Sequence, residues 1–374
     1  MTSGLARTPL FELHKALDAR LVPFAGWEMP VQYQGVKQEH LATRSAIGLF
    51  DVSHMGQLEV TGSGALAEVN RLITNDLERA VDGQALYTGC CNEQGTLLDD
   101  LIVYRLHPAH ILIVCNASNH DKIVAHFQAQ LSNRVRMTDH GQERCLIAVQ
   151  GPKAISAVSS LLTADAGAVD LGRELPPFRT REFVLAERAG LWPKSTVRVA
   201  RTGYTGEDGV EIFCANAIAP ALFRELMARG GTPCGLAARD TLRLEACLCL
   251  YGHEINESTD PLEAGIGWTV KLDKSDFIGK AALVQRKAQG PSRKLVGFEM
   301  TGRGIARSDY PLLDLAGKVV GHCTSGAPCP TTGKNLGLGY LPVGMTAIGT
   351  EFLVDCRGKN ITAQVIKTPF YRRA

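Results

Sequence analysis

The 374-residue sequence lacks the features of a membrane protein, and also those of a protein that binds nucleic acid through its overall charge. No apolar run approaches the roughly 18 residues that span a bilayer, and the longest uncharged stretch, residues 335–350, is interrupted by glycines and a proline. The 40 Lys and Arg residues nearly balance the 38 Asp and Glu residues, so no excess of one sign is available to attract a polyanion. Too few residues precede the first helix signal for a targeting peptide. We therefore expect a cytoplasmic protein with no membrane and no nucleic acid among its partners.

Common catalytic and metal-binding motifs are missing as well. The sequence has no G-x-x-x-x-G-K-[ST] phosphate loop and no G-x-S-x-G nucleophile motif, and its G-x-G fragments at Gly302 and Gly337 lack the context of a dinucleotide site. His253 and Glu254 begin an H-E-x-x-H pattern that no second histidine completes. The eleven cysteines form no C-x-x-C pair, and the histidines do not cluster. We therefore expect no metal site, no nicotinamide chemistry and no P-loop chemistry.

What is present indicates a folded protein of two to three domains. Hydrophobic residues make up 45% of the chain and charged residues 21%, so a sizeable core can form. Thr8, as N-cap, and Pro9 are predicted to begin the first helix. Between about residues 56 and 131 the pattern of strand, helix, three strands and helix predicts a compact α+β unit. After about residue 288, short strand-like runs with Gly and Pro between them predict a small β-barrel or sandwich.

Two acidic positions stand where packing alone does not require an acid. Asp99 and Asp100 interrupt the apolar run 97–103, and strand alternation turns one of them toward the buried side. A buried acid costs several kcal/mol unless it is paired or used. Glu211 lies in a strand between Val210 and Ile212, on the face opposite to both. Each pattern also fits a structural acid, either ion-paired near a hairpin or on the solvent side of an edge strand.

A predicted helix begins near Leu236 and carries several charged residues. Arg239 and Arg243 share one face at a spacing of four residues. For Arg243 and Glu245 we expect a solvated helix surface with ion pairs. The C-terminal Pro369-Phe-Tyr-Arg-Arg segment, which contains Arg372, reads from its pattern alone as a basic tail.

Several segments taken in order resemble the tetrahydrofolate-dependent aminomethyltransferases, the T-proteins of the glycine cleavage system. The similarity covers essentially the whole chain, and the order and spacing of the segments carry it. The segments are FAGWEMPVQY (residues 24–33), FDVSHM (50–55), NEQGTLLDDLIV (92–103), VQGP (149–152), RTGYTGEDGVE (201–211), GLAARD (235–240), LYGH (250–253), CTSG (323–326) and PFYR (369–372).

The resemblance implies an α+β fold of three lobes arranged as a cloverleaf around a central folate channel. A discontinuous folate-binding domain would comprise residues 1–50 and 141–288. A ferredoxin-like α+β insert, residues 51–140, would carry the catalytic aspartate, and residues 289–374 would form a C-terminal β-barrel.

The implied reaction uses tetrahydrofolate as acceptor and the lipoylated H-protein as partner. The methylene of an aminomethyl group on the lipoyl arm passes to tetrahydrofolate, which yields ammonia, 5,10-methylenetetrahydrofolate and the dihydrolipoyl arm. By resemblance, Asp100 is the catalytic aspartate and Glu211 binds the paired N–H edge of the pterin. The same resemblance places the following residues at folate-binding positions: Arg239, Arg372, Tyr204, Tyr87 and Asn116.

Related activities remain as alternatives. A folate-dependent demethylase of the same fold is one, although Asp100 and the GYTGED segment favour the amine-releasing enzyme. A non-catalytic folate-binding iron–sulfur maintenance protein is another, but its K-G-C-Y-x-G-Q-E signature is replaced here by RTGYTGE, without the cysteine. A folate lobe of an amine dehydrogenase would need a flavin-binding half, which this chain lacks. For His54 we expect a structural, hydrogen-bonded histidine, and His253 has no assigned role.

Overall fold

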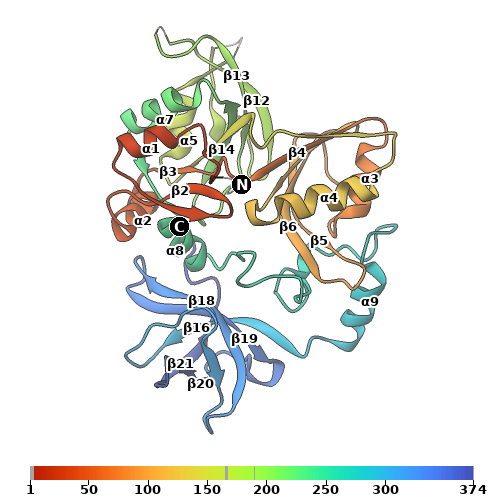
Figure 1. Ribbon diagram of the computed structural model, residues 1–374, viewed down its shortest axis with the longest axis vertical. Coiled ribbons are helices and arrows are strands. Elements are labelled where there is room, and N and C mark those ends of the chain that lie inside the picture. Colours follow the sequence, from red (N-terminus) through yellow and green to blue (C-terminus); the bar gives the residue numbers. More distant parts are fainter. Residues whose placement is uncertain (1–3, 165–166, 189, 374) are drawn as a thin grey trace. The chain divides into compact units, whose positions relative to one another are not determined.

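The computed structural model describes residues 4–164, 167–188 and 190–373. The described chain separates into two compact units. Unit 1 comprises Met1–Asn70, Leu77–Tyr87 and Leu101–Arg239, and unit 2 comprises Arg71–Asp76, Thr88–Asp100 and Asp240–Ala374. Figure 1 colours the chain along its sequence, so the interleaving of the two units can be followed in it.

Unit 1 contains an eight-stranded sheet of order β11-β10-β12-β13-β14-β9-β3-β15. Its neighbouring strands pair antiparallel, except that β15 pairs parallel to β3. The strands are β3 (Gly48–Asp51), β9 (Arg144–Gln150), β10 (Leu162–Ala164), β11 (Gly167–Ala168), β12 (Thr180–Leu185), β13 (Ser195–Ala200), β14 (Gly209–Ala215) and β15 (Thr232–Pro233).

One face of this sheet is covered by helices. Leu49, Ile147, Val149, Val210 and Ile212 alternate along three strands and lie in one hydrophobic core. That core also takes residues from α1 (Phe11–Ala16), α5 (Ala154–Ser159) and α7 (Ala219–Ala228), which gather beside β3 and β14 in Figure 1. The opposite face is therefore the one left for a site.

The start of α1 differs from the prediction. The helix begins at Phe11 with Leu10 in the cap position, not at Thr8 and Pro9. The Thr8 hydroxyl donates instead to Asp51 Oδ2 at 2.6 Å, and it accepts only a 3.3 Å hydrogen bond from the Leu10 amide. A tertiary partner 43 residues away thus replaces the local cap.

A five-stranded sheet of order β5-β6-β7-β4-β8 follows the predicted succession of elements. Thr88–Asp100, which includes the end of β5 and the start of β6, belongs to unit 2. The elements are β4 (Gly56–Thr61), α3 (Ala65–Leu72), β5 (Gln84–Cys91), β6 (Leu97–His107), β7 (His110–Cys115), α4 (His120–Gln130) and β8 (Arg136–Asp139).

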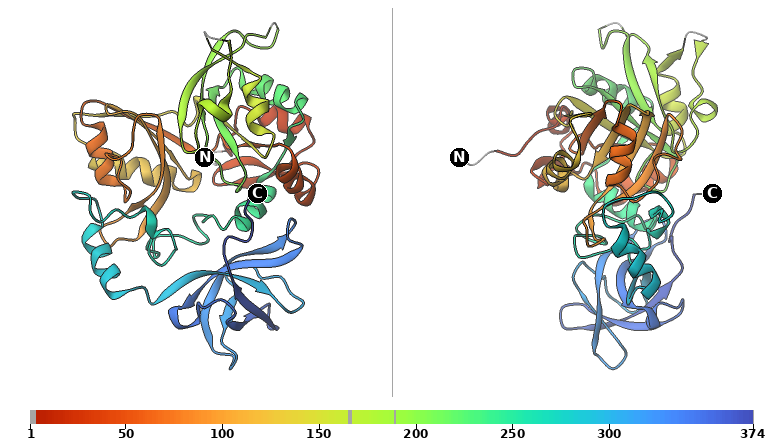
Figure 2. Two further views of the ribbon diagram at one scale, coloured as in Figure 1. Left: turned by 180° about the vertical axis from the view of Figure 1, so that it is seen from behind. Right: turned by 90° about the vertical axis from the view of Figure 1, so that its right-hand side faces the viewer.

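Unit 2 contains a closed six-stranded barrel, which confirms the predicted C-terminal β-barrel. Phe298 and Phe352 meet edge to face in its core, with ring centroids 5.3 Å apart. The barrel strands, blue in both views of Figure 2, run in the order β16-β19-β18-β17-β20-β21. They are β16 (Arg293–Met300), β17 (Pro311–Leu313), β18 (Val319–Cys329), β19 (Lys334–Pro342), β20 (Glu351–Asp355) and β21 (Asn360–Ile366).

The remaining elements connect these sheets. Helix α8 (Leu236–Glu245) crosses from unit 1 to unit 2 after Arg239. The others are β1 (Arg20–Phe24), β2 (Trp27–Gln32), α2 (Val36–Ser45), α6 (Leu171–Glu174), α9 (Lys280–Gln289) and single 3₁₀ turns at Ala117–Asn119, Gly267–Thr269 and Val343–Met345.

The mixed α+β class is confirmed, whereas the domain boundaries and the shared folate channel stay predictions. In the described parts of the chain, no helix combines the length and the apolarity needed to cross a bilayer.

Candidate active site

Glu211 lies on the sheet face opposite to the helical core of unit 1. In the antiparallel register it stands beside Ala200 on β13 and Ala148 on β9, and Ala148 pairs in turn with Phe50 on β3. Directly paired residues point to the same face. Glu211 is half-buried while Ala200, Ala148 and Phe50 are fully buried, so its carboxylate is the acidic group in an apolar row. The alternation seen in the sequence placed this side chain correctly.

Two hydroxyl groups that the sequence did not reveal surround the Glu211 carboxylate. The Thr202 hydroxyl donates a very short hydrogen bond to Glu211 Oε2, and the Tyr104 hydroxyl lies 3.2 Å from Thr202 Oγ1. Because Thr202 gives its proton to Glu211, its oxygen can accept from Tyr104. Burial, reinforced by the negative charge of Glu211, raises the pKa of Tyr104 well above its ordinary value, so the phenol stays a donor. Tyr104 ends an apolar run and Thr202 lies in a polar loop. Neither position could therefore be recognised as part of a site from the sequence.

Arg239 and Tyr204 form the second half of this site. The Arg239 guanidinium carbon lies 4.7 Å from the centre of the Tyr204 ring, a cation–π distance. Burial lowers the pKa of Arg239, and the negative charge of Glu211 acts against that shift. An arginine remains a cation under these conditions. Unit 1 therefore brings together a carboxylate, a guanidinium and an aromatic face, at three residues predicted from the sequence.

The loop that carries Tyr204, residues 201–209, is fixed by ion pairs. Arg201 contacts Asp208 through two parallel bonds, Nε to Oδ1 at 3.0 Å and Nη2 to Oδ2 at 2.6 Å. Arg44 from α2 donates through Nη1 to the Thr205 carbonyl at 2.6 Å and to Glu207 Oε1 at 3.0 Å. The loop is thus held from both of its sides by charged hydrogen bonds.

Two positions of this loop require glycine, each for a different reason. At Gly203 a Cβ atom would lie 1.9 Å from the side-chain oxygen of Gln150, so a larger residue would have to displace the Gln150 amide. Gly206 has φ +80°, a conformation that favours glycine. Gln150 also donates to the carbonyl oxygens of Thr202 and Val210. It therefore holds the two ends of the loop on either side of Tyr204.

Tyr87 and Asn116 also lie in unit 1, and both are half-buried. Tyr87 is on β5, and Asn116 follows β7 in an extended conformation immediately before a 3₁₀ turn. Their assignment to folate stays a prediction.

Asp100 lies in unit 2, and its burial differs from that of Asp99. The Asp99 side chain is fully buried, whereas Asp100 is half-buried. The structure therefore decides which acid of the pair faces the interior, and it leaves Asp100 accessible. Burial and the negative charges of Glu254 and Asp100 raise the pKa of the Cys249 thiol well above its ordinary value. Cys249 is thus a neutral neighbour of Asp100.

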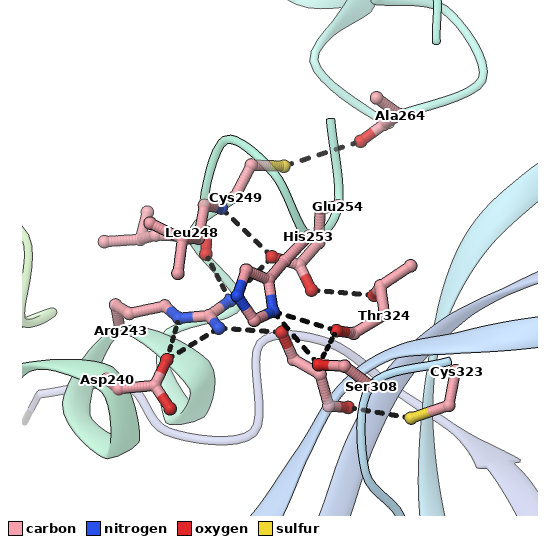
Figure 3. Close-up of polar contacts among 12 residues, drawn as sticks. Asp240, Arg243, Leu248, Cys249, His253, Glu254, Ala264, Ser308, Cys323 and Thr324 are labelled. Carbon is pink, nitrogen blue, oxygen red and sulfur yellow. Dashed lines mark hydrogen bonds and ion pairs between the residues drawn. The ribbon is translucent and has the colours of Figure 1, made fainter. Parts of the chain in front are cut away.

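The turn that carries Cys249 is held by a buried ionic network around Arg243, drawn in Figure 3. Arg243 is 1% exposed and donates to Asp240 Oδ1 at 2.7 Å and to Glu254 Oε2 at 2.7 Å. Glu254 also accepts from the Leu250 amide at 3.0 Å and from Thr324 on β18 at 2.7 Å. Every acceptor oxygen of Glu254 is therefore engaged within unit 2.

This network corrects one prediction. Arg243 forms ion pairs as expected, but it is buried and not on a solvated helix face. Glu245 is likewise buried, and its Oε1 accepts from the Thr331 amide at 2.9 Å. The loop after α8 and strand β18 cover this side of the helix, and helical periodicity does not reveal such tertiary cover.

The C-terminal segment is anchored and is not a free tail. The Tyr371 amide donates to the Glu245 carbonyl at 2.8 Å, and Phe370 packs against a core that includes Leu244 and Leu338. Arg372 follows as an exposed cation in unit 2. Its assignment to folate stays a prediction.

The histidines show one departure from expectation. We expected a structural, hydrogen-bonded histidine at His54. The side chain is buried, but its Nδ1 has no hydrogen-bond partner among the protein atoms that the structure describes. His253 is exposed, with Nδ1 3.1 Å from the Thr324 carbonyl. Within the described ranges, no set of three or more His, Cys, Asp or Glu side chains is arranged to hold a metal ion.

Comparison with known proteins gives consistent matches over nearly the whole chain. Residues 10–274 match the GCVT N-terminal domain family, and residues 293–372 match the glycine cleavage T-protein C-terminal barrel domain. The chain is 47% identical to an aminomethyltransferase of Shouchella clausii, with 100% of both chains covered. It is 43% identical to that of Bacillus subtilis, with 99% and 100% covered. The crystal structure of glycine cleavage system aminomethyltransferase T from Bartonella henselae matches with a TM-score of 0.88 and 35% identity, and 98% of each chain is covered.

Proposed function

Because this chain belongs to the glycine cleavage T-protein family of aminomethyltransferases, we propose that it acts on an aminomethyl group carried by the lipoyl arm of H-protein. The methylene passes to tetrahydrofolate, so that ammonia, 5,10-methylenetetrahydrofolate and the dihydrolipoyl arm are the products. No electron acceptor is needed, because the bond to sulfur and the bond to nitrogen are both exchanged for bonds to folate nitrogens.

The Glu211 carboxylate is the observation that carries the folate assignment. A pterin presents a 2-amino group beside a ring N–H, and two parallel donors of this kind suit the two oxygens of one carboxylate. Glu211 is half-buried in an otherwise apolar row, and Thr202 orients it by donating to Oε2. The carboxylate acceptor of unit 1 therefore suits the pterin of tetrahydrofolate.

Arg239 and Tyr204 supply complementary contacts to the same ligand. The face of Tyr204 suits a flat heteroaromatic ring, and Arg239 offers N–H donors to an acceptor oxygen. Tyr87, Asn116 and Arg372 are assigned to folate by their match to the family motifs.

Asp100 is assigned the catalytic role. Its carboxylate stabilises positive charge on the one-carbon unit while the amine departs, and it holds a proton that the acceptor nitrogen gives up. Support comes from its half-buried position beside fully buried Asp99. The other task of the protein is to hold the two substrates in reach and exclude water, which would otherwise take the one-carbon unit.

Ammonia release from aminomethylated H-protein, measured with and without tetrahydrofolate, tests this function. We expect release that depends on both substrates. Methyl transfer from a sulfonium donor would identify a folate-dependent demethylase instead. Reduced-folate binding with neither activity would identify a maintenance protein.

A further inference from the structure

His54 of unit 1 holds a buried polar atom that lacks a protein partner. The side chain is 5% exposed, and Nδ1 has no hydrogen-bond partner among the described protein atoms. The imidazole meets the Phe24 ring edge to face, with ring centroids 5.6 Å apart. An unpartnered buried nitrogen opposes folding, because it loses its hydrogen bonds to water without replacement. We therefore expect this nitrogen to gain a hydrogen-bond partner in another state of the protein, such as a ligand-bound state.

The sheet topology brings His54 to the same edge as Arg239. Strands β3 and β15 are parallel, with Thr232 opposite Gly48 and Pro233 opposite Leu49. The carboxyl ends of parallel strands meet at one edge of a sheet, so the turn that follows β3 and the helix α8 that follows β15 start from that edge. In agreement, the charge of Arg239 adds to burial in lowering the pKa of His54 to about 4, while Asp51 opposes the shift. The imidazole is therefore neutral near pH 7.

The second charged group beside His54, Asp51, is bonded to other partners. Asp51 Oδ2 accepts from Thr8 at 2.6 Å and contacts His14 Nε2 at 2.8 Å. Asp51 Oδ1 accepts from the Ser53 amide at 2.9 Å. Both carboxylate oxygens are thus engaged in other bonds.

The Arg239 guanidinium, in contrast, has donors to spare. It lies over the Tyr204 ring, and among the described residues it donates no hydrogen bond; only the Arg239 backbone amide does, to the Gly235 carbonyl at 3.1 Å. A guanidinium has five N–H donors and no acceptor, and a neutral imidazole has one nitrogen that accepts. The unused donors of Arg239 and the unused acceptor of His54 are therefore complementary.

We propose that His54 is a positioning residue for Arg239, and that its imidazole nitrogen accepts a hydrogen bond from the guanidinium when a reduced folate occupies the site beside Glu211 and Tyr204. The inference rests on the proposed folate-binding function. One edge of the guanidinium is held by His54, and the other is presented to an acceptor oxygen of the ligand. In the ligand-free protein Arg239 rests on the Tyr204 face instead.

Binding of 5-formyltetrahydrofolate, a stable reduced folate, tests the inference by calorimetry on the full chain. We expect His54→Leu to weaken binding about tenfold or more without lowering the thermal unfolding temperature of the ligand-free protein. His54→Asn keeps an acceptor near the position of Nδ1 and is expected to restore most of the affinity. His110→Leu removes a half-buried histidine paired with Glu59, far along the chain from the site, and serves as the matched control.

A double-mutant cycle shows whether His54 acts through Arg239. In an Arg239→Met background, His54→Leu is expected to add little further loss of affinity. An equal loss in both backgrounds would overturn the inference, as would unchanged affinity in His54→Leu together with a lower unfolding temperature, which indicates a purely structural histidine. If the wild-type protein does not bind the reduced folate, the proposed function fails and this inference falls with it. If the wild type binds and His54→Leu binds equally well, only the inference fails.

Discussion

The hydroxyl group of Thr202 donates its hydrogen bond to the carboxylate of Glu211, nine residues further along the chain. Thr202 follows β13 and Glu211 lies within β14, so the antiparallel pairing of these strands creates the contact. Tyr104 completes the arrangement from β6, with its hydroxyl 3.2 Å from Thr202. The carboxylate is therefore oriented before any ligand arrives.

The substitution Thr202→Val removes this donor while it keeps the shape of the side chain. We expect reduced-folate binding to weaken about tenfold, because the carboxylate loses its orienting hydrogen bond. Calorimetric titration measures the change. Thr163→Val, at an exposed position on β10, is the control and should bind as the wild type does. Wild-type affinity in Thr202→Val would remove this hydroxyl from the site.

The substitution Asp100→Asn removes the charge assigned to catalysis. We expect turnover to fall by about 100-fold or more while reduced-folate binding survives. Ammonia release and calorimetric binding, measured on one preparation, separate the two effects. Asp99→Asn is the contrasting variant: this fully buried acid is expected to affect thermal stability first. Near-normal ammonia release by Asp100→Asn would take Asp100 out of the mechanism.

The Arg44–Glu207 ion pair is expected to stabilise the loop that carries Tyr204. The two side chains are 6% and 4% exposed, so Arg44→Met leaves a buried carboxylate without its partner. A loss of about 3–5 kcal/mol in the free energy of unfolding follows. Urea denaturation measures it, and the double variant Arg44→Met/Glu207→Gln should recover part of the loss. An unchanged unfolding midpoint in Arg44→Met would contradict the assignment.

Because the pKa of His54 is lowered in the folded protein, we expect a specific loss of stability in mild acid. Its folded-state pKa is about 4, below the ordinary value of 6.5, so between these values the unfolded chain takes up a proton that the folded chain does not. Stability is therefore lost as the pH falls, by about 2 kcal/mol between pH 7.5 and pH 5 from this group. His54→Leu should show a smaller loss over the same interval, measured by urea unfolding at both pH values. Parallel pH profiles for the two proteins would show that His54 is not held neutral.

Much of the fold follows from local patterns that the sequence displays directly. Alternation around Glu211 places Val210 and Ile212 in the core and the carboxylate on the other face. Short apolar runs separated by Gly and Pro become the strands of the C-terminal barrel. These features depend on near neighbours and on a period of two, so they can be predicted without tertiary information.

Other features depend on residues that are distant in the chain. Arg243 is buried because Glu254 from a loop and Ser325 from β18 bond to it. Thr8 was predicted to cap the first helix, but its hydroxyl donates to Asp51 instead. Periodicity cannot show such cover, because it reports one face of one element at a time.

The sequence by itself determined the family and the α+β class, and it predicted the acids assigned to the site, because each is expressed in short motifs and local periodicity. Only the tertiary structure decided that Thr202 orients Glu211, that Asp99 and not Asp100 is the fully buried acid, and that His54 keeps an unpartnered nitrogen near Arg239. Hydrogen-bond partners and burial are set by strand register and by the elements that cover a side chain, and these arise only when distant segments pack together.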